Sequence, residues 1–314
     1  YLTCLLAVAC FLTFPDPVMA ETPKKSVLVT GASSGIGRNL VETLASSGYH
    51  VYAGARKEQD LKALDAIDNI TAVKLDVTRQ AEVDAVVEQI RKSGSGLYGL
   101  VNNAGVGGGG EVVSTAIEEQ RFVYDVNVEG VYRVTRAFAP LVMESSGRIV
   151  TTGSIAGILS SFPGYSSYSG SKHWIEAFTD VLAVEMEPHG VWVAVVEPGN
   201  YKSNIRRSSV SRRLDQLRAA GGEVTAEMKE AYEKTAAREL SFKEPDDVSR
   251  AFMHALFDDE PLRRYMVVPN ADEHSFTVQT ILTELAQVNK WGPYSIERDE
   301  LVKMLDKALA GDSE

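Results

Sequence analysis

From Lys25 onward the sequence alternates short runs of β-branched and aliphatic residues with longer stretches whose apolar residues recur at helical spacing. Four apolar residues share one helical face in residues 81–92, namely Val83, Val86, Val87 and Ile90. Strands that alternate with helices pair in parallel, because each helix carries the chain back across the sheet in a right-handed crossover. The expected strands are 27–30, 50–55, 72–75, 99–102, 148–152, 191–196 and 264–268. The pattern predicts a doubly wound α/β fold with a mainly seven-stranded parallel sheet, helices on both faces and ligands at the carboxyl ends of the strands.

The first expected strand runs directly into a glycine-rich turn at which a helical pattern begins. Its residues are Thr30, Gly31, Ala32, Ser33, Ser34, Gly35, Ile36 and Gly37. Glycine lets the backbone turn tightly and approach a pyrophosphate, and the free N–H groups of a helix start attract an anion. A plain strand-to-helix connection also uses glycine, but three glycines at this junction favour a dinucleotide-binding turn.

The residues after the second expected strand bear on which dinucleotide binds. A carboxylate there would bind the adenosine ribose hydroxyl of NAD, whereas the 2′-phosphate of NADP calls for a cation. The sequence has Ala55 followed by Arg56, whose guanidinium can make a forked contact with a phosphate, assisted by Ser33 and Arg38. Lys57 is a competing cation, and Arg56 as an ordinary exposed side chain is the alternative. NADP(H) is therefore the favoured cofactor, and NAD(H) stays open.

The spacing Gly-x-x-x-Gly-x-Gly resembles the TGxxxGIG turn of the compact branch of the short-chain dehydrogenase/reductase family. Three further segments resemble that family in the expected order. Asp76-Val77 resembles the pair that flanks the adenine, Asn102-Asn103-Ala104-Gly105 resembles the NNAG motif beside the cofactor, and Pro198-Gly199 with Ser203 resembles the PGxxxT segment at the nicotinamide, with serine in place of threonine. The resemblance spans roughly residues 25–270 and implies one Rossmann-like catalytic domain of an NAD(P)-dependent oxidoreductase.

Reduction of a ketone by hydride leaves an alkoxide that must be protonated, so the site needs a proton donor with a tuned pKa. Of the 12 tyrosines, Tyr168 alone has a lysine four positions later, Lys172, which puts the phenol and the ammonium on one helical face. An ordinary phenol has a pKa of about 10, and we expect the ammonium and a bound nicotinamide ring to lower it. In the family a serine at the place of Ser154, 14 residues before Tyr168, hydrogen-bonds the carbonyl.

A fourth residue, Asn127, matches the asparagine with which relatives hold a water that links the lysine to solvent. A buried structural or capping asparagine is the alternative. With Asn127 the expected catalytic set is complete and occurs in the family's order: Asn127, Ser154, Tyr168 and Lys172.

Composition limits the partners of the chain. A chain of 314 residues can bury about 75% of its unfolded surface, so its stability requires neither disulfides nor metal. The net charge of -11 disfavours nucleic acid and anionic membrane surfaces, and a small molecule is the expected partner. The two cysteines, Cys4 and Cys10, lie in the apolar opening, so the catalytic domain offers no thiol for zinc or for nucleophilic catalysis, and no metal is expected. The resemblance also implies a homo-oligomer, a dimer or a tetramer.

The opening 1–20 reads as the apolar part of a signal peptide with cleavage after Ala20, or as an anchor. It lacks an initial Met and a preceding basic residue, and a truncated or misassigned start would look the same, so exported, membrane-associated and cytoplasmic locations stay open. The apolar run is too short for a membrane span, and no span is expected in the catalytic domain.

Two segments lie outside the alternating pattern. Residues 203–240 look helical and are expected to form a substrate lid, with a solvated surface helix pair without a role as the alternative. We expect Arg206, Arg207, Arg212 and Arg213 in this segment to serve solubility rather than substrate binding. The extension 271–314, with Trp291 and Tyr294, is expected to cover the pocket, mediate dimer contact or pack on the surface.

The substrate is expected to be an apolar alcohol or ketone, because the Val-Glu-Pro-Gly segment and the lid are similar to the steroid and retinol dehydrogenase-like branch. The alternatives are a 3-oxoacyl-type reductase, the same chemistry with NAD, and a dinucleotide sensor without turnover.

Overall fold

The structure is a computed structural model that describes residues 25–159 and 163–311. Its centre is a seven-stranded sheet in the order β3-β2-β1-β4-β5-β6-β7, in which every neighbouring pair is parallel. The strands are β1 (Ser26–Val29), β2 (His50–Ala55), β3 (Ile70–Lys74), β4 (Gly99–Asn102), β5 (Arg148–Thr152), β6 (Trp192–Pro198) and β7 (Arg264–Val267). The order reverses direction between β1 and β4, so the predicted doubly wound fold is confirmed, with its ligand crevice expected at this point.

Four strands differ at their ends from the sequence prediction, β1 and β7 by one residue and β3 and β6 by up to two. β3 begins at Ile70 rather than at residue 72, because Asn69 turns the chain with a φ of 64° and Ile70 then pairs with Val51. β6 runs through Pro198 rather than ending at residue 196, because β7 pairs alongside it as far as Pro198 and Val267.

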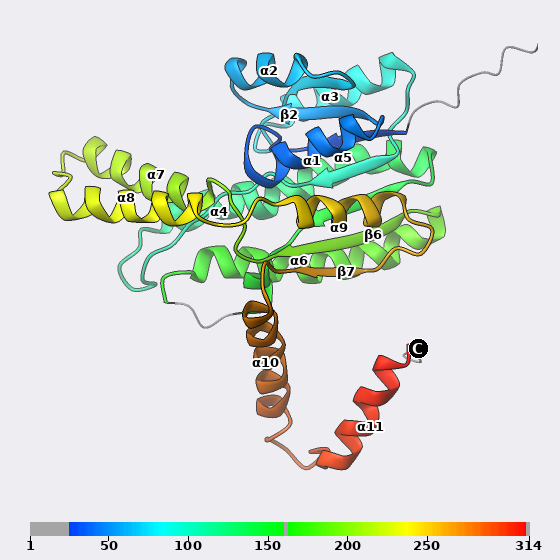
Figure 1. Cartoon of the computed structure of the whole chain (residues 1–314), viewed down its shortest axis with the longest axis vertical. Coiled ribbons are helices and arrows are strands. Elements are labelled where there is room, and N and C mark those ends of the chain that lie inside the picture. The colour runs from blue at the N-terminus through cyan, green and yellow to red at the C-terminus, as the bar shows by residue number, and fades with distance from the viewer. Residues whose placement is uncertain (1–24, 160–162, 312–314) are drawn as a thin grey trace, which may run out of the picture.

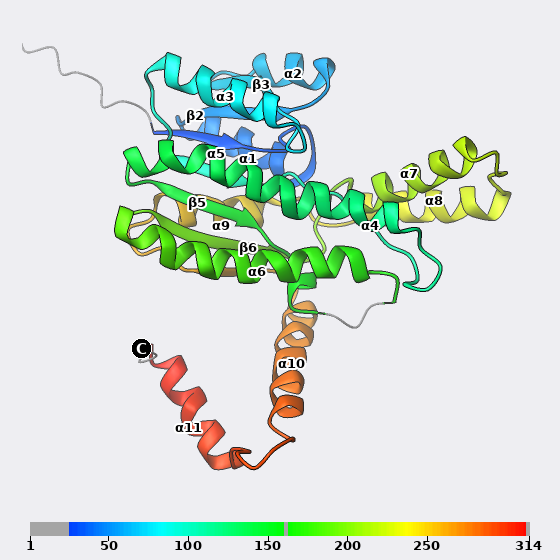
Figure 2. The same cartoon turned by 180° about the vertical axis from the view of Figure 1, so that it is seen from behind.

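Helices cover both faces of the sheet (Figures 1 and 2). One face carries α1 (Gly35–Ser46), α2 (Glu58–Asp65) and α9 (Asp246–Phe257). The other carries α3 (Gln80–Ser93), α5 (Gly130–Glu144) and α6 (Ser166–Met186), with α4 (Ile117–Tyr124) before α5. The strands are therefore buried on both sides, which explains their nearly continuous runs of valine, isoleucine and alanine.

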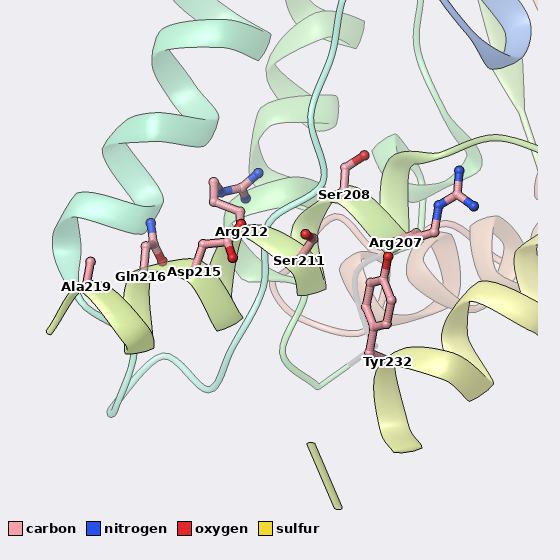
Figure 3. A pocket seen from close by; sticks show the side chains of 8 residues that line it. All are labelled: Arg207, Ser208, Ser211, Arg212, Asp215, Gln216, Ala219 and Tyr232. Carbon is pink, nitrogen blue, oxygen red and sulfur yellow. The ribbon is translucent and has the colours of Figure 1, made fainter. Parts of the chain in front are cut away.

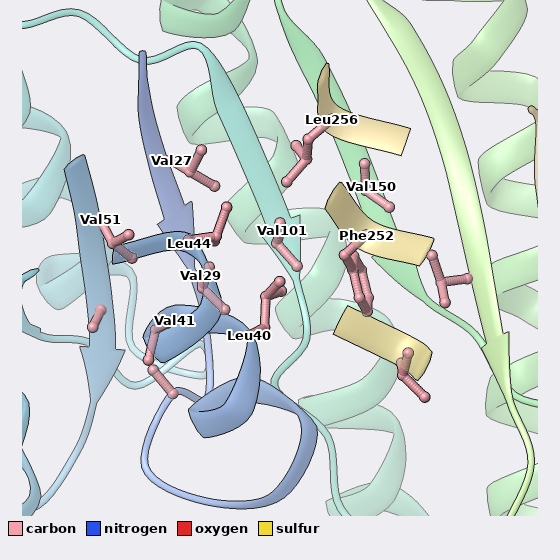
Figure 4. Packing of buried hydrophobic residues seen from close by; sticks show 14 of the residues in the cluster. Val27, Val29, Leu40, Val41, Leu44, Val51, Val101, Val150, Phe252 and Leu256 are labelled. Atoms are coloured by element: carbon pink, nitrogen blue, oxygen red, sulfur yellow. The ribbon is translucent and has the colours of Figure 1, made fainter. Parts of the chain in front are cut away.

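The core on the first face shows how the packing fixes the position of α1 (Figure 4). Leu40 and Leu44 of α1 and Phe252 of α9 pack over Val29 and Val101 of the sheet, and all five side chains are fully buried. Each such side chain contributes about 1.5–3 kcal/mol of burial free energy. This packing holds the start of α1 at the carboxyl end of β1, where the glycine turn lies.

Two helix pairs extend beyond the sheet and its layers (Figure 1). The first is α7 (Ile205–Ala219) and α8 (Ala226–Leu240), within the segment expected to form the lid. The second is α10 (Ala271–Val288) and α11 (Arg298–Leu309), which project away from the sheet. Trp291 and Tyr294, between α10 and α11, are 94% and 90% exposed, so neither covers a pocket within this chain. The expected signal or anchor segment 1–20 lies outside the described residues.

Candidate active site

Four segments meet at the carboxyl ends of the central strands. Thr30 follows β1, and its Oγ1 accepts hydrogen bonds from the backbone N–H groups of Asn103 and Ala104 after β4, both at 3.0 Å. The side chain of Asn103 donates in turn to the carbonyl of Thr30 at 3.0 Å and contacts Thr152 of β5, whose Oγ1 donates to Asn103 Oδ1 at 3.3 Å. The Asn-Asn-Ala-Gly segment therefore ties the glycine turn to the end of β5.

The turn after β1 has the backbone geometry of an anion site. Gly31 and Gly35 have φ angles of 68° and 57°, which other residues rarely adopt. A Cβ on Gly31 would lie 2.8 Å from Ala104 Cα, and one on Gly37 would lie 2.3 Å from the carbonyl oxygen of Gly31. Ser34 is the N-cap of α1, but its side chain makes no capping hydrogen bond within the described part of the chain. The first N–H groups of α1 are thus available to a phosphate, and the cradle fits a dinucleotide.

Arg56, the positively charged residue predicted to bind the 2′-phosphate of NADP, lies at the surface after β2. Ala55 is buried, and the Arg56 side chain is 60% exposed, with its Nη1 3.9 Å from Asp76 Oδ2. Burial raises the pKa of Asp76, but hydrogen bonds from Thr78 and the charges of Arg56 and Arg79 lower it overall. Val77 is buried beside Asp76. Arg38, the expected helper, pairs instead with Glu42 on its own helix at 2.6 Å.

Ser154, Tyr168 and Lys172 lie together as the sequence predicts. Ser154 follows β5, and its side chain is hydrogen-bonded to the partly buried Tyr168 of α6. Lys172 lies one helical turn after Tyr168, with its Nζ 5.8 Å from the centre of the phenol ring. That Nζ donates to the carbonyl of Thr152 at 2.7 Å, and the lysine is 5% exposed. A phenol, a hydroxyl and a buried amine thus converge at the end of β5.

Without a bound cofactor, the pKa of the phenol is raised, so the lowering predicted for Tyr168 beside both Lys172 and a nicotinamide ring stays a prediction for the complex. Burial raises the pKa of Tyr168 above its ordinary value, against the opposing effects of the Ser154 hydrogen bond and the charge of Arg206. Burial also lowers the pKa of Lys172 to about 8, opposed by the charge of Glu176. The spacing of residues in the sequence predicts which side chains are neighbours but not how deeply they are buried. Burial has the largest effect on the pKa values of both Tyr168 and Lys172.

Asn127 lies in a π-helical turn, Asp125–Glu129, between α4 and α5. Its side chain is 1% exposed, donates to Ser171 Oγ and to the carbonyl of Val106, both at 3.0 Å, and accepts from the N–H of Val106 at 2.9 Å. Ser171 precedes Lys172, so Asn127 joins the catalytic helix to the loop after β4. These contacts are those of the buried structural asparagine kept open above. A Cβ on Gly105 would lie 3.5 Å from Asn127 Oδ1, which brings that glycine to the same place.

The end of β6 and the segment after it lie against Ser154 and the glycine turn. Ser154 Oγ donates to the carbonyl of Pro198 at 3.5 Å, and Ser203 lies opposite the glycine turn, 3.3 Å from the position of a Cβ on Gly35. The N–H of Asn200, beside Gly199, donates to Glu273 at the base of α10 at 2.8 Å. The glycine turn, the Asn-Asn-Ala-Gly segment, Ser154 and the segment after β6 therefore lie together at the carboxyl ends of the strands, whereas Arg56 is paired with Asp76 at the exposed end of β2.

Two buried carboxylates that the sequence did not single out hold α7 in place. Glu239 of α8 is 2% exposed and accepts the backbone N–H groups of Arg206 and Arg207 at 2.7 and 2.9 Å, which satisfies the start of α7. Glu119 of α4 is 6% exposed and pairs with Arg212 at 2.6 Å. The prediction that Arg212 serves solubility is wrong, since it also donates to the carbonyl of Gly107 at 2.7 Å and so fixes α7 to the loop after β4.

Two hollows border this region. One of about 540 Å³ lies between α7 and α8, with Arg207 and Arg212 on one helix and Tyr232 on the other (Figure 3). The other, of about 280 Å³, lies between the loop before α4 and the start of α6, and Val112, Ile117 and Tyr124 contribute to its wall. Within the described residues we find no group of His, Cys, Asp and Glu side chains suited to a metal ion, and no helix long and apolar enough to cross a membrane.

Comparison with known proteins decides the family. Residues 25–214 match the family model described as short chain dehydrogenase. The chain belongs to the short-chain dehydrogenase family. It is accordingly an NAD(P)-dependent oxidoreductase that acts on CH–OH groups and the corresponding carbonyls.

Relatives of this short-chain dehydrogenase include mitochondrial D-beta-hydroxybutyrate dehydrogenase of Bos taurus, 36% identical over 80% of this chain and 77% of the relative. Retinol dehydrogenase 16 of Homo sapiens is 34% identical over 79% and 82% of the two chains. Among solved structures, a short-chain dehydrogenase/reductase of Burkholderia phymatum in complex with NAD is 27% identical, with a TM-score of 0.72 over 88% of this chain and 100% of that one. The relatives thus share the fold and the reaction class but differ widely in the alcohols for which they are named.

Proposed function

We propose that Tyr168 is the acid and base of this dehydrogenase, that Ser154 binds the substrate carbonyl, and that NADP(H) is the cofactor. The observation that carries the proposal is the hydrogen bond between Tyr168 and Ser154 beside the amine of Lys172. Replacement of Tyr168 by phenylalanine tests it, with a large loss of turnover at unchanged cofactor affinity as the expected result.

The roles of the residues follow from their positions. A bound nicotinamide supplies or accepts the hydride. Ser154 donates a hydrogen bond to the carbonyl oxygen, and Tyr168 gives its proton to the alkoxide that forms. Burial keeps the phenol protonated in the protein alone, which is the form that ketone reduction needs. Alcohol oxidation needs the phenolate, which the positive charge of a nicotinamide ring and of Lys172 favours.

Asn127 is proposed to complete the path by which Lys172 exchanges protons with solvent. Its support is the hydrogen bond to Ser171, the residue before Lys172. Asn127 therefore also positions the catalytic helix, and an Asn127→Asp variant tests the two roles together through the solvent isotope effect on turnover. An isotope effect equal to that of the wild type would contradict the proton-path role.

The choice of NADP(H) is supported by the buried Ala55, which leaves no carboxylate at the ribose, and by the exposed Arg56. We expect Arg56→Asp to weaken NADPH binding roughly tenfold to a hundredfold, as loss of one charged hydrogen-bonding partner does, and to leave NADH binding unchanged or stronger. Fluorescence titration of both cofactors measures it, with Lys57→Asp as the matched control. Equal NADPH affinity in the wild type and Arg56→Asp would contradict the assignment.

We propose an apolar alcohol or ketone as the substrate. The support is the apolar part of the 280 Å³ hollow beside the start of α6, together with the steroid and retinol names of several relatives. One observation favours a second candidate, a hydroxy acid, because the positive charge of Arg206 acts on Tyr168 and would suit a substrate carboxylate. Comparing kcat/KM for steroid and retinoid substrates with kcat/KM for a short oxo acid separates the two substrate classes. An Arg206→Gln variant should lower kcat/KM for the oxo acid alone.

The pair α7 and α8 is proposed as the substrate lid. Its support is the anchoring of α7 by Glu239 and by the Glu119–Arg212 ion pair, which leaves the rest of the pair extending past the sheet. If this is its role, Arg212→Gln raises KM for a large substrate while the affinity for NADPH stays constant. An unchanged KM would count against the lid.

A homo-oligomer is proposed for the enzyme in solution. Its support is the exposed apolar face of α10, on which Ile281, Leu285 and Val288 are 44%, 45% and 74% exposed, since few monomers leave such a face uncovered. Light scattering on the full chain measures the molar mass. A mass of 34.2 kDa, that of one chain, would contradict the proposal.

A further inference from the structure

A cluster of charged side chains lies behind Lys172, on the far side from Tyr168 along α6. Glu176 lies one helical turn after Lys172 and forms an ion pair with Arg264 of β7. Arg264 also pairs with Glu197 of β6 at 3.0 Å and with Asp180 of α6 at 2.7 Å. The guanidinium of Arg264 thus forms ion pairs with three carboxylates. Two of them are mostly buried, since the side chains of Glu176 and Glu197 are 13% and 3% exposed.

The second oxygen of Glu176 points into the region beside Ser154. Glu176 Oε1 is buried and has no hydrogen-bond partner within the described part of the chain. A Cβ on Gly153 or on Gly157 would lie 2.9 Å from this oxygen, so the two glycines that flank the Ser154 turn make room for it. A buried carboxylate oxygen without a donor costs free energy unless it carries a proton or faces a nearby charge.

The charges of the cluster do not balance when every group is ionised. Arg264 pairs with all three carboxylates, and Lys172 interacts with Glu176 alone, so three negative charges are balanced by two positive ones and a carboxyl group retains a proton more readily. Burial and the neighbouring Glu197 raise the pKa of Glu176 to about 8, against the opposing charge of Arg264. Lys172, whose pKa burial lowers to about 8, therefore changes its charge in the same pH range as Glu176.

We propose that Glu176 is a positioning residue that sets the charge of Lys172, and thereby the upper pH limit of ketone reduction at Tyr168. The inference rests on the proposed function, because it requires that a charged Lys172 supports the reaction. As the pH rises, Glu176 loses its proton, and its negative charge then holds Lys172 in the charged form to higher pH. The groups that face Glu176 are Lys172 and Asp180 from α6, Glu197 from β6 and Arg264 from β7.

The experiment is the pH profile of kcat for ketone reduction in the full chain. In Glu176→Gln the lysine loses its anionic neighbour, so we expect the alkaline limb to move to lower pH by about one unit, as a nearby charge typically shifts a pKa. Asp180→Asn is the matched control, because the exposed carboxylate of Asp180 also contacts Arg264 but lies one helical turn farther from Lys172. The alkaline limb of this variant should stay at the pH of the wild type. A Glu176→Gln enzyme that is slower at every pH with an unmoved limb would overturn the proposal and leave Glu176 a structural residue.

A second variant keeps the test decisive if Glu176→Gln folds poorly. Arg264 lowers the pKa of Glu176, so Arg264→Gln should keep Glu176 protonated to higher pH and, like Glu176→Gln, move the alkaline limb to lower pH.

Infrared spectroscopy gives a readout besides activity, since a protonated carboxyl band near neutral pH should be present in the wild type and lost in Glu176→Gln. Its absence from the wild type would contradict the inference. If Tyr168→Phe instead keeps near-normal turnover, the proposed function itself fails, and the two failures are thereby distinguished.

Discussion

Replacement of Tyr168 by phenylalanine is expected to lower turnover roughly a hundredfold to ten-thousandfold, because it removes the general acid and base and retains the ring. The affinity for NADPH should stay close to that of the wild type, since the glycine turn and the segment after β6 are untouched. Steady-state rates with NADPH and a fluorescence titration of the cofactor measure both quantities.

The matched control is Tyr165→Phe, one helical turn earlier and 38% exposed. This variant also removes a phenol hydroxyl, but from a tyrosine that has no assigned role in the reaction. The turnover of Tyr165→Phe should therefore be close to that of the wild type. A Tyr168→Phe enzyme that is as active as Tyr165→Phe would refute the assignment of the acid and base.

The second large effect is expected at Ser154. Ser154→Ala removes the hydroxyl that hydrogen-bonds Tyr168 and that we propose binds the substrate carbonyl, and loss of one oxyanion donor typically costs about a hundredfold to a thousandfold in kcat. Ser154 Oγ also accepts the N–H of Ala156 at 3.1 Å, so a small loss of stability accompanies the change. Ser154→Thr retains the hydroxyl and should recover most of the rate. If Ser154→Thr is as slow as Ser154→Ala, the serine acts through the local fold and not through its hydroxyl.

The sequence predicted those parts of the site that depend on local backbone geometry. The positive φ angles of Gly31 and Gly35 require glycine, so the turn is visible as a motif. The approach of Tyr168 to Lys172 follows from helical spacing alone. The order of the strands followed from the alternating pattern, and only the ends of strands such as β3 and β6, which depend on their neighbours, were misplaced.

Features that arise from tertiary contacts left no signal in the sequence. Glu239 caps a helix 33 residues away, and Glu119 pairs with an arginine 93 residues away, so neither partner could be chosen from spacing. Arg212 was expected to be a solvated side chain for the same reason. The raised pKa of Tyr168 in the protein without cofactor could not be read from spacing, because burial is a property of the folded chain.

Because the pKa of Tyr168 is raised in the protein alone, a bound cofactor has to lower it further than the spacing of Tyr168 and Lys172 suggested. The protein alone favours the neutral phenol, which can protonate an alkoxide but cannot accept a proton from an alcohol. If Tyr168 is the base as proposed, oxidation would therefore require the positive charge of an oxidised nicotinamide bound close to this phenol. Reduction and oxidation should accordingly differ in their pH dependence.

The most direct measurement is the titration of the Tyr168 phenol by its ultraviolet absorbance with and without NADP⁺, using Tyr168→Phe as the reference. We predict that NADP⁺ moves the pKa of this phenol from above its ordinary value of about 10 towards neutrality. A phenol whose pKa stays above that value in the complex would contradict the assignment of Tyr168 as the acid and base.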